Sequence, residues 1–180
     1  MSDTAEDLLQ QAQRARREHR LEDAKRDLVA AVALRRKAGG QDLARALTAL
    51  GQIERDQRQN DAALQHHEEA VTIYRAAGEP LKLAHTIRHV ADILRETERA
   101  KLAEPRYDEA LALYRHHPET PPLDLANAIR GLALLKSDTG ETEAARTLWE
   151  EARELYAAVN VEAGVTESNR RLALLTKDEV

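Results

Sequence analysis

The strongest constraint on the fold of this chain is an internal repeat with a period of about 40 residues. The segment EAVTIYR at residues 69–75 returns as EALALYR at residues 109–115, and again as EARELY at residues 151–156. The tetrapeptide LALL at residues 132–135 is repeated identically at residues 172–175. Such a chain folds as stacked copies of one unit, because a single unit cannot bury its apolar face alone.

Each repeat is predicted to consist of two helices. The chain holds 32 alanines and 25 leucines but has only 3% aromatic residues, which favours helices over strands. Glycine and proline separate the units, as expected of residues that end one helix and begin the next. The predicted helix pairs are 5–18 and 21–37, 41–57 and 61–77, 81–98 and 100–116, and 122–138 and 141–158, followed by a single helix at 162–176.

Small and large residues recur at fixed places within these helices. In the first helices the pattern appears as Leu47-x2-Leu50-Gly51, Ile87-x2-Val90-Ala91 and Ile129-x2-Leu132-Ala133. In the second helices it appears as Ala63-x3-His67-x2-Ala70, Ala103-x3-Tyr107-x2-Ala110 and Ala145-x3-Trp149-x2-Ala152. This pattern resembles the tetratricopeptide repeat. The unit length of 39–42 residues is similar to the longer-repeat branch typified by kinesin light chains.

The resemblance implies an all-α fold, a right-handed α-solenoid of about four antiparallel helix hairpins with a C-terminal capping helix. We expect a single repeat domain over residues 1–180, with units at about 5–38, 41–78, 81–118 and 122–159 and the capping helix at 162–176. Two features depart from the family pattern. Glu54 and Lys136 stand where the first helix usually has an aromatic residue, and Pro105 inside a predicted helix is expected to cause a kink or a late helix start.

In this family the first helix of each hairpin lines a concave groove. The resemblance therefore implies a set of groove residues: Arg45, Thr48, Gln52, Arg55, His85, Arg88, Asp92, Arg95, Asn127, Arg130, Leu134 and Arg170. Arg88, Arg130 and Arg170 occupy the same position in successive units. Such a series of arginines suits bidentate contacts to the carboxylates of an acidic or C-terminal peptide. The alternative is that these arginines pair internally with Asp92, Glu96, Asp138 and Glu167.

Histidines offer the second candidate chemistry. His85, His89 and Asp92 lie at i, i+4 and i+7, so a helix presents them on one face, a spacing that can hold a divalent metal. The pattern lacks the glutamate of a zinc-protease motif, and ordinary groove polarity is the competing interpretation. His67 occupies an aromatic packing position and is expected to be a half-buried spacer.

Composition and motifs exclude several function classes. The chain has no cysteine, which rules out disulfides and thiolate catalysis. It carries no Gly-rich phosphate loop or hydrolase elbow, so we predict that it is not an enzyme and needs no cofactor. A net charge of −5 argues against a nucleic-acid partner. The sequence shows no apolar run long enough to span a membrane and no secretory signal, so we expect no membrane partner. We therefore expect a cytoplasmic scaffold that binds a protein or peptide partner.

The last helix leaves the oligomeric state open. Leu172, Leu174 and Leu175 lie on the predicted helix 162–176. This helix either caps the fourth hairpin, which gives a monomer, or offers its uncovered apolar side to a second copy, which gives a homodimer.

Overall fold

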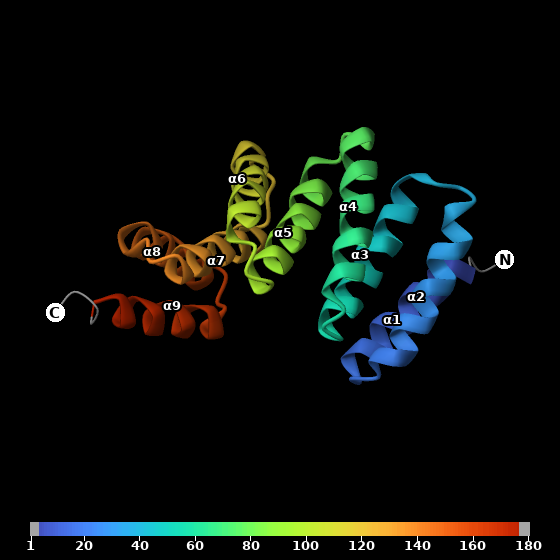
Figure 1. The fold of residues 1–180 in the computed structure, drawn as a ribbon, viewed down its shortest axis with the longest axis horizontal. Coiled ribbons are helices and arrows are strands. Elements are labelled where there is room, and N and C mark those ends of the chain that lie inside the picture. Colours follow the sequence, from blue (N-terminus) through green and yellow to red (C-terminus); the bar gives the residue numbers. More distant parts are fainter. Residues whose placement is uncertain (1–3, 177–180) are drawn as a thin grey trace. The chain divides into compact units, whose positions relative to one another are not determined.

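The structure is a computed structural model that describes residues 4–176. Within this range the chain forms nine α-helices and no strand (Figure 1). The helices are α1 (Thr4–Arg17), α2 (Leu21–Arg36), α3 (Gly40–Asp56), α4 (Asn60–Ala77), α5 (Pro80–Glu96), α6 (Ala100–His116), α7 (Pro122–Asp138), α8 (Thr142–Ala158) and α9 (Glu162–Leu175). Each predicted helix is therefore present, with ends that differ from the prediction by no more than two residues.

The chain divides into two compact units, Met1–Ile93 and Leu94–Val180, which are called unit 1 and unit 2 below. In unit 1, α1 packs against α2 and α3 against α4, and α2 contacts α3 to join the two hairpins. In unit 2, α7 packs against α8, with α6 against α7 and α9 against α8. The boundary between the units falls inside α5.

Alanines at repeat positions let neighbouring helices approach closely. The two alanines that mark the second helix of each hairpin have no exposed surface in any copy: Ala24 and Ala31, Ala63 and Ala70, Ala103 and Ala110, Ala145 and Ala152. Large side chains fill the space beside them, and Leu47, Ile129 and Trp149 are fully buried. This alternation of small and large residues gives the close packing that helix pairs require.

A left-handed residue ends the first helix of each hairpin. His19, Arg58, Glu98 and Gly140 occupy equivalent positions with φ between 59° and 79°. The next residue then donates its backbone N–H to a carbonyl five residues back, for example Gln59 to Glu54 at 2.8 Å. This bond satisfies a carbonyl at the helix end that would otherwise lack a partner. The sharp turn that results lets the second helix run back along the first.

The expected late start at Pro105 is wrong, because α6 begins at Ala100 and continues through the proline. Pro105 lacks the N–H that would bond the carbonyl of Lys101, which lies in the first turn of α6. Both residues are exposed, so water can satisfy that carbonyl. The proline therefore costs less here than it would in the middle of a buried helix.

The last helix packs on the hairpin before it. Leu175 belongs to a buried cluster with Leu134 and Trp149, and Leu172 packs against this cluster. Leu174, in contrast, is 46% exposed. The capping role predicted for this helix therefore matches its position in unit 2.

Candidate functional site

The first helices of unit 1 carry a continuous polar network on one face. Arg16 of α1 donates to Asp56 of α3 at 2.8 Å and to the side-chain carbonyl of Gln52 at 2.9 Å. On the same pair of helices, Arg45 forms an ion pair with Glu6. Two of the predicted groove residues, Arg45 and Gln52, thus link α3 to α1.

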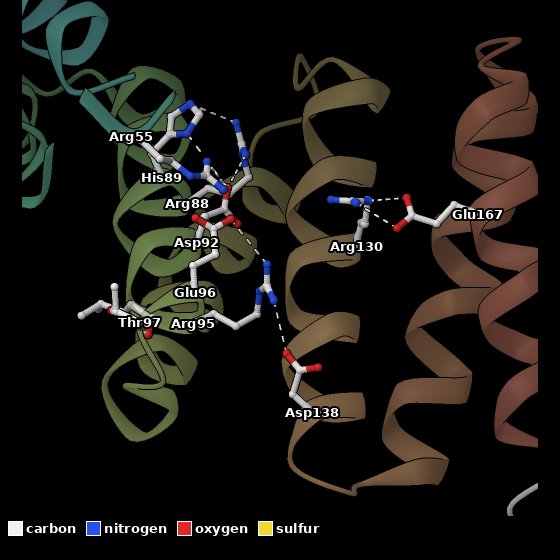
Figure 2. A network of polar contacts seen from close by, with 11 residues as sticks. Arg55, Arg88, His89, Asp92, Arg95, Glu96, Thr97, Arg130, Asp138 and Glu167 are labelled. Atoms are coloured by element: carbon white, nitrogen blue, oxygen red, sulfur yellow. Dashed lines mark hydrogen bonds and ion pairs between the residues drawn. The ribbon is translucent and has the colours of Figure 1, made fainter. Parts of the chain in front are cut away.

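Asp92 is the centre of the network between α3 and α5 (Figure 2). Its carboxylate accepts hydrogen bonds from Arg88 at 2.9 Å and from Arg55 at 3.2 Å. Asp92 is only 8% exposed. Two guanidinium groups therefore surround one buried carboxylate, and this compensates for the removal of the carboxylate from water.

Three histidines adjoin this carboxylate. The ring of His89 stacks on that of His67, with centroids 5.3 Å apart, and meets the ring of His85 edge-on at 4.7 Å. The Nε2 atom of His89 also lies 3.1 Å from the side-chain nitrogen of Gln52 and 3.2 Å from a guanidinium nitrogen of Arg88. Because both nitrogens are donors, His89 Nε2 accepts from them and carries no proton itself.

Burial keeps two of these histidines neutral. It lowers the pKa of His67 to about 3, and the charge of Arg55 adds to this effect. Burial, followed by the charge of Arg88, holds the pKa of His89 well below its usual range. The ring nitrogens of His67 have no hydrogen-bond partner, and its side chain is fully buried rather than half-buried as expected. His67 fits because it packs on Gly51, where a side chain would collide with its ring.

The histidines do not form a metal centre of the usual kind. Across residues 4–176, the structure holds no group of three or more histidine, aspartate or glutamate side chains arranged to bind a metal ion. The Nε2 atoms of His85 and His89 lie 3.2 Å apart, but a guanidinium nitrogen of Arg88 is equally near to His89. A cation placed there would be repelled by Arg88.

In unit 2 two of the three predicted arginines, Arg95 and Arg130, are also paired (Figure 2). Arg95 of α5 contacts Asp138 of α7 at 3.2 Å and its neighbour Glu96 at 3.6 Å. Arg130 of α7 holds Glu167 of α9 with two hydrogen bonds, of 2.6 and 2.9 Å. The hydrogen bond from Arg130 is the main reason that the pKa of Glu167 is lowered.

The structure thus contains the internal network that the sequence offered as the alternative for these arginines. All four of the carboxylates expected in it, Asp92, Glu96, Asp138 and Glu167, lie in ion pairs with groove arginines. The forked geometry expected for a carboxylate ligand is present at Arg130, where the chain itself supplies the carboxylate.

The remaining groove candidates lie in different surroundings. Thr48 is 9% exposed and donates to the backbone of its own helix at Ala44. The side-chain oxygen of Asn127 accepts a hydrogen bond of 2.8 Å from the hydroxyl of Tyr156. Leu134 is buried in the core cluster of unit 2, whereas Arg170 on α9 is exposed.

Two features of unit 1 were not found from the sequence. The first is a pocket of about 160 Å³ between α1 and α3, lined by Glu6, Leu9, Gln10, Ala12, Gln13, Arg16, Leu28, Arg45, Ala49, Gln52 and Ile53. The second is the buried carboxylate of Glu54, which is 3% exposed and lies 2.6 Å from His66 and 3.4 Å from Lys25. In the sequence, Glu54 stands where the family pattern has an aromatic residue. This departure from the pattern was the signal that could have revealed the buried carboxylate.

A stack of two-helix hairpins whose first helices carry the polar side chains places this chain among the α-helical repeat proteins. The sequence agrees with this class, because residues 43–77 match the family model described as tetratricopeptide repeat. The resemblance to the tetratricopeptide repeat predicted from the sequence is therefore confirmed for residues 43–77. The chain matches no curated protein sequence.

Solved structures share the fold across nearly the whole chain. Aspartyl phosphate phosphatase F from Bacillus subtilis aligns with a TM-score of 0.85 at 13% identity, covering 97% of this chain and 46% of that one. A structure of the kinesin light chain TPR-like repeats from Podosopora anserina aligns with a TM-score of 0.76 at 16% identity, covering 98% and 88%. This chain therefore spans about half of the first structure and most of the second. These likenesses confirm the α-solenoid fold class.

None of the helices in the described part of the chain is both long enough and apolar enough to span a membrane. The cytoplasmic location expected from the sequence stays a prediction.

Proposed function

We propose that this chain is a non-catalytic scaffold that holds a peptide segment of a protein partner against the first helices of its hairpins. The match to the tetratricopeptide repeat, a fold that serves protein interaction, supports this proposal. The polar side chains described above place hydrogen-bonding groups on the first helices, whose other side chains pack against neighbouring helices. In this proposal the net charge of −5 disfavours nucleic acid as the partner.

The geometry of Arg130 is the observation that carries the proposal furthest. Its guanidinium already holds a carboxylate through two hydrogen bonds, and its side chain is 38% exposed. A carboxylate from an acidic or C-terminal peptide can replace Glu167 in the same fork, because the donors and their spacing are unchanged. Arg88 offers a second anchor, but it is more buried, with 12% of its side chain exposed.

The proposed peptide site comprises the groove residues of each unit separately. In unit 1 these are Arg45, Thr48, Gln52, Arg55, His85, Arg88 and Asp92, and in unit 2 they are Arg95, Asn127, Arg130, Leu134 and Arg170. Arginines act as anchors, whereas the amides of Gln52 and Asn127 are suited to bond the peptide backbone.

Affinity capture from the native lysate, followed by peptide mapping, identifies the segment with which to test this site. The captured segment is then titrated against Arg88→Ala and Arg130→Ala. The matched controls are Arg36→Ala and Arg115→Ala, because both arginines pair with in-chain carboxylates on second helices, Glu69 at 2.7 Å and Glu151 at 2.9 Å.

Loss of a buried charge-assisted contact should cost about 2–5 kcal/mol of binding free energy, and loss of a contact at the rim much less. The two controls should bind as the native chain does. If both groove variants also bind as tightly as the native chain, the arginines are not the anchors.

A second candidate function is self-association through α9. The observation that favours it is Leu174, which is 46% exposed on the last helix beside the partly buried Leu172. Light scattering over a hundredfold range of concentration tests it. A dimer that Leu174→Gln dissociates supports this function, and a monomer at every concentration removes it.

A further inference from the structure

The pocket between α1 and α3 suggests where a peptide is held in unit 1. Its floor consists of apolar side chains from three helices, among them Leu9, Leu28 and Ile53. At its volume of about 160 Å³, and with roughly 30 Å³ for each water molecule in the liquid, it has room for about five water-sized groups. A leucine side chain has four such carbon groups, so one aliphatic side chain fits.

Ala49, whose side chain is small, lines the pocket on the side of α3. The equivalent position in α5 is His89, whose ring is buried against His67 and Gln52 and fills the space beside α3. The same fold therefore closes this space in one place and leaves it open in the other. The two places differ in Ala49 against His89 and in Leu28 against His67, and the first of these lies on the face that the proposed function assigns to the peptide.

The rim of the pocket is polar but has no unbalanced charge. Arg16 is paired with Asp56, and Arg45 with Glu6. Gln10 and Gln13 of α1 stand at the rim with exposed side chains. Each glutamine amide has both donors and an acceptor, which matches the N–H and C=O groups of an extended peptide backbone. A neutral aliphatic residue suits these surroundings better than an acidic one.

We propose that the α1–α3 pocket is an anchor site for one leucine- or isoleucine-sized side chain of the partner peptide, with Gln10 and Gln13 bonding the backbone on either side. This inference rests on the proposed function, and it adds apolar burial to the contacts that the arginines supply in unit 1. Recognition at this site is then for an aliphatic residue within a segment, whatever acidic residues flank it.

The test uses N-acetyl-leucine N′-methylamide, which is one leucine with a peptide bond on each side. It is titrated into the full chain while the methyl groups of alanine and isoleucine are followed by NMR. Saturable shifts are expected at Ala12, Ala49 and Ile53. The matching glycine derivative should bind about tenfold more weakly, because it buries no side chain.

Two variants locate the site. Ala49→Leu fills the pocket and should abolish the saturable shifts, whereas Ala30→Leu on the exposed side of α2 should leave them unchanged. Gln13→Ala removes a rim amide without altering the packing, and should weaken binding of the leucine derivative severalfold. It keeps the test decisive if Ala49→Leu does not fold.

Three results would overturn the inference: no saturable shifts with the leucine derivative, equal binding of the glycine derivative, or tighter binding of the matching aspartate derivative at the same methyl groups. None of these decides the proposed function, which depends on a captured segment and the variants of Arg88 and Arg130. If the arginine variants lose the captured segment and one of these three results is also obtained, the scaffold function is supported and only the proposal for the pocket is wrong.

Discussion

The two units place opposite charges at the same position of the repeat. In unit 1, Glu54 on α3 lies between Lys25 of α2 and His66 of α4. In unit 2, the equivalent residue is Lys136 on α7, which contacts Glu104 of α6 at a position equivalent to Lys25, as well as Glu141. At this position, where the family pattern has an aromatic residue, α3 and α7 each carry an ion pair between neighbouring hairpins, with the polarity reversed from one unit to the other, whereas α5 carries the buried Leu94.

The difference shows what this repeat position requires. In the two charged copies either sign is accepted, because the helix of the preceding hairpin supplies the opposite one. The environments differ in depth. The side chain of Glu54 is 4% exposed and those of Lys25 and His66 are 26% and 25% exposed, whereas the side chain of Lys136 is 13% exposed and its two partners are 44% and 48% exposed. A buried charge is costly to leave without its partner, and an exposed one is not.

Reversal of the charge at this position should therefore hurt unit 1 more than unit 2. We expect Glu54→Lys to lower the free energy of unfolding by about 3–5 kcal/mol, because it buries a second positive charge beside Lys25. Lys136→Glu should cost only about 1 kcal/mol, because solvent screens its partners. Urea denaturation of both variants measures the difference.

The double variant Lys25→Glu/Glu54→Lys restores opposite charges and should recover more than half of the loss. Equal losses for the two single variants, or no recovery in the double variant, would mean that the ion pair is not what this position requires.

Acid should destabilise unit 1 more than unit 2. The pKa of His67 is about 3 in the folded chain against an ordinary value of 6.5, so the unfolded chain binds the proton first. Stability is then complete above about pH 6.5 and is lost as the pH falls from there toward 3. For His67 alone the loss at pH 5 is about 2 kcal/mol.

Unit 2 has Tyr107 at the equivalent position, which does not titrate in this range. Hydrogen exchange at pH 7.5 and pH 5, corrected for the intrinsic exchange rate, should show the loss of protection in α3, α4 and the N-terminal part of α5. His67→Leu, which places there the residue that α2 has at the equivalent Leu28, should reduce this pH dependence and leave the part that the buried His89 contributes. A uniform loss of protection in both units would contradict the account.

Substitution of the glycines that lie against the large rings should produce a smaller difference in stability between the units. A Cβ atom at Gly51 would come within 2.7 Å of His67, and one at Gly131 within 2.5 Å of Tyr107. Overpacking costs more than the gain in helix propensity, so each Gly→Ala change should destabilise by about 1–2 kcal/mol, with the larger loss at Gly131. Thermal unfolding of the two variants compares them. A gain in stability at either site would mean that the ring moves aside without cost.

The smallest expected effects lie in the turns within the hairpins. Arg58 in unit 1 and Gly140 in unit 2 occupy the same left-handed position, with φ of 60° and 79°. Gly140→Ala should destabilise by about 1 kcal/mol, whereas Arg58→Gly should be neutral or stabilising by up to about 1 kcal/mol. Chemical denaturation checks both. If Arg58→Gly destabilises the chain more than Gly140→Ala does, the side chain of Arg58 contributes more to stability than its left-handed backbone costs.

The helices could be predicted from the sequence because the signals that place them are local. Glycines, prolines and the recurring alanines placed the helices of residues 4–176 to within two residues, and the same pattern gave the resemblance to the tetratricopeptide repeat. The late helix start offered at Pro105 was wrong, because the cost of a proline depends on whether the carbonyl that it leaves unpaired faces water. That depends on packing, which a local pattern does not contain.

The candidate site was only partly accessible from the sequence. Equivalence of positions found Arg88, Arg130 and their carboxylate partners, but it could not decide between a ligand and an internal pair, since both use the same donors. The burial of Glu54 and the stacking of His67 on His89 depend on contacts between hairpins. The α1–α3 pocket was missed because it is a space between side chains, and no residue type signals an empty space.

The most direct measurement of the central claim is a map of the chemical shifts that change when the captured partner segment binds to the isotope-labelled chain. The account predicts that the changes gather on the first helices of the hairpins, with Ala49 and the side chain of Arg130 among the most affected. Changes confined to second helices such as α2, α4 and α8, or to Leu174 on α9, would contradict it.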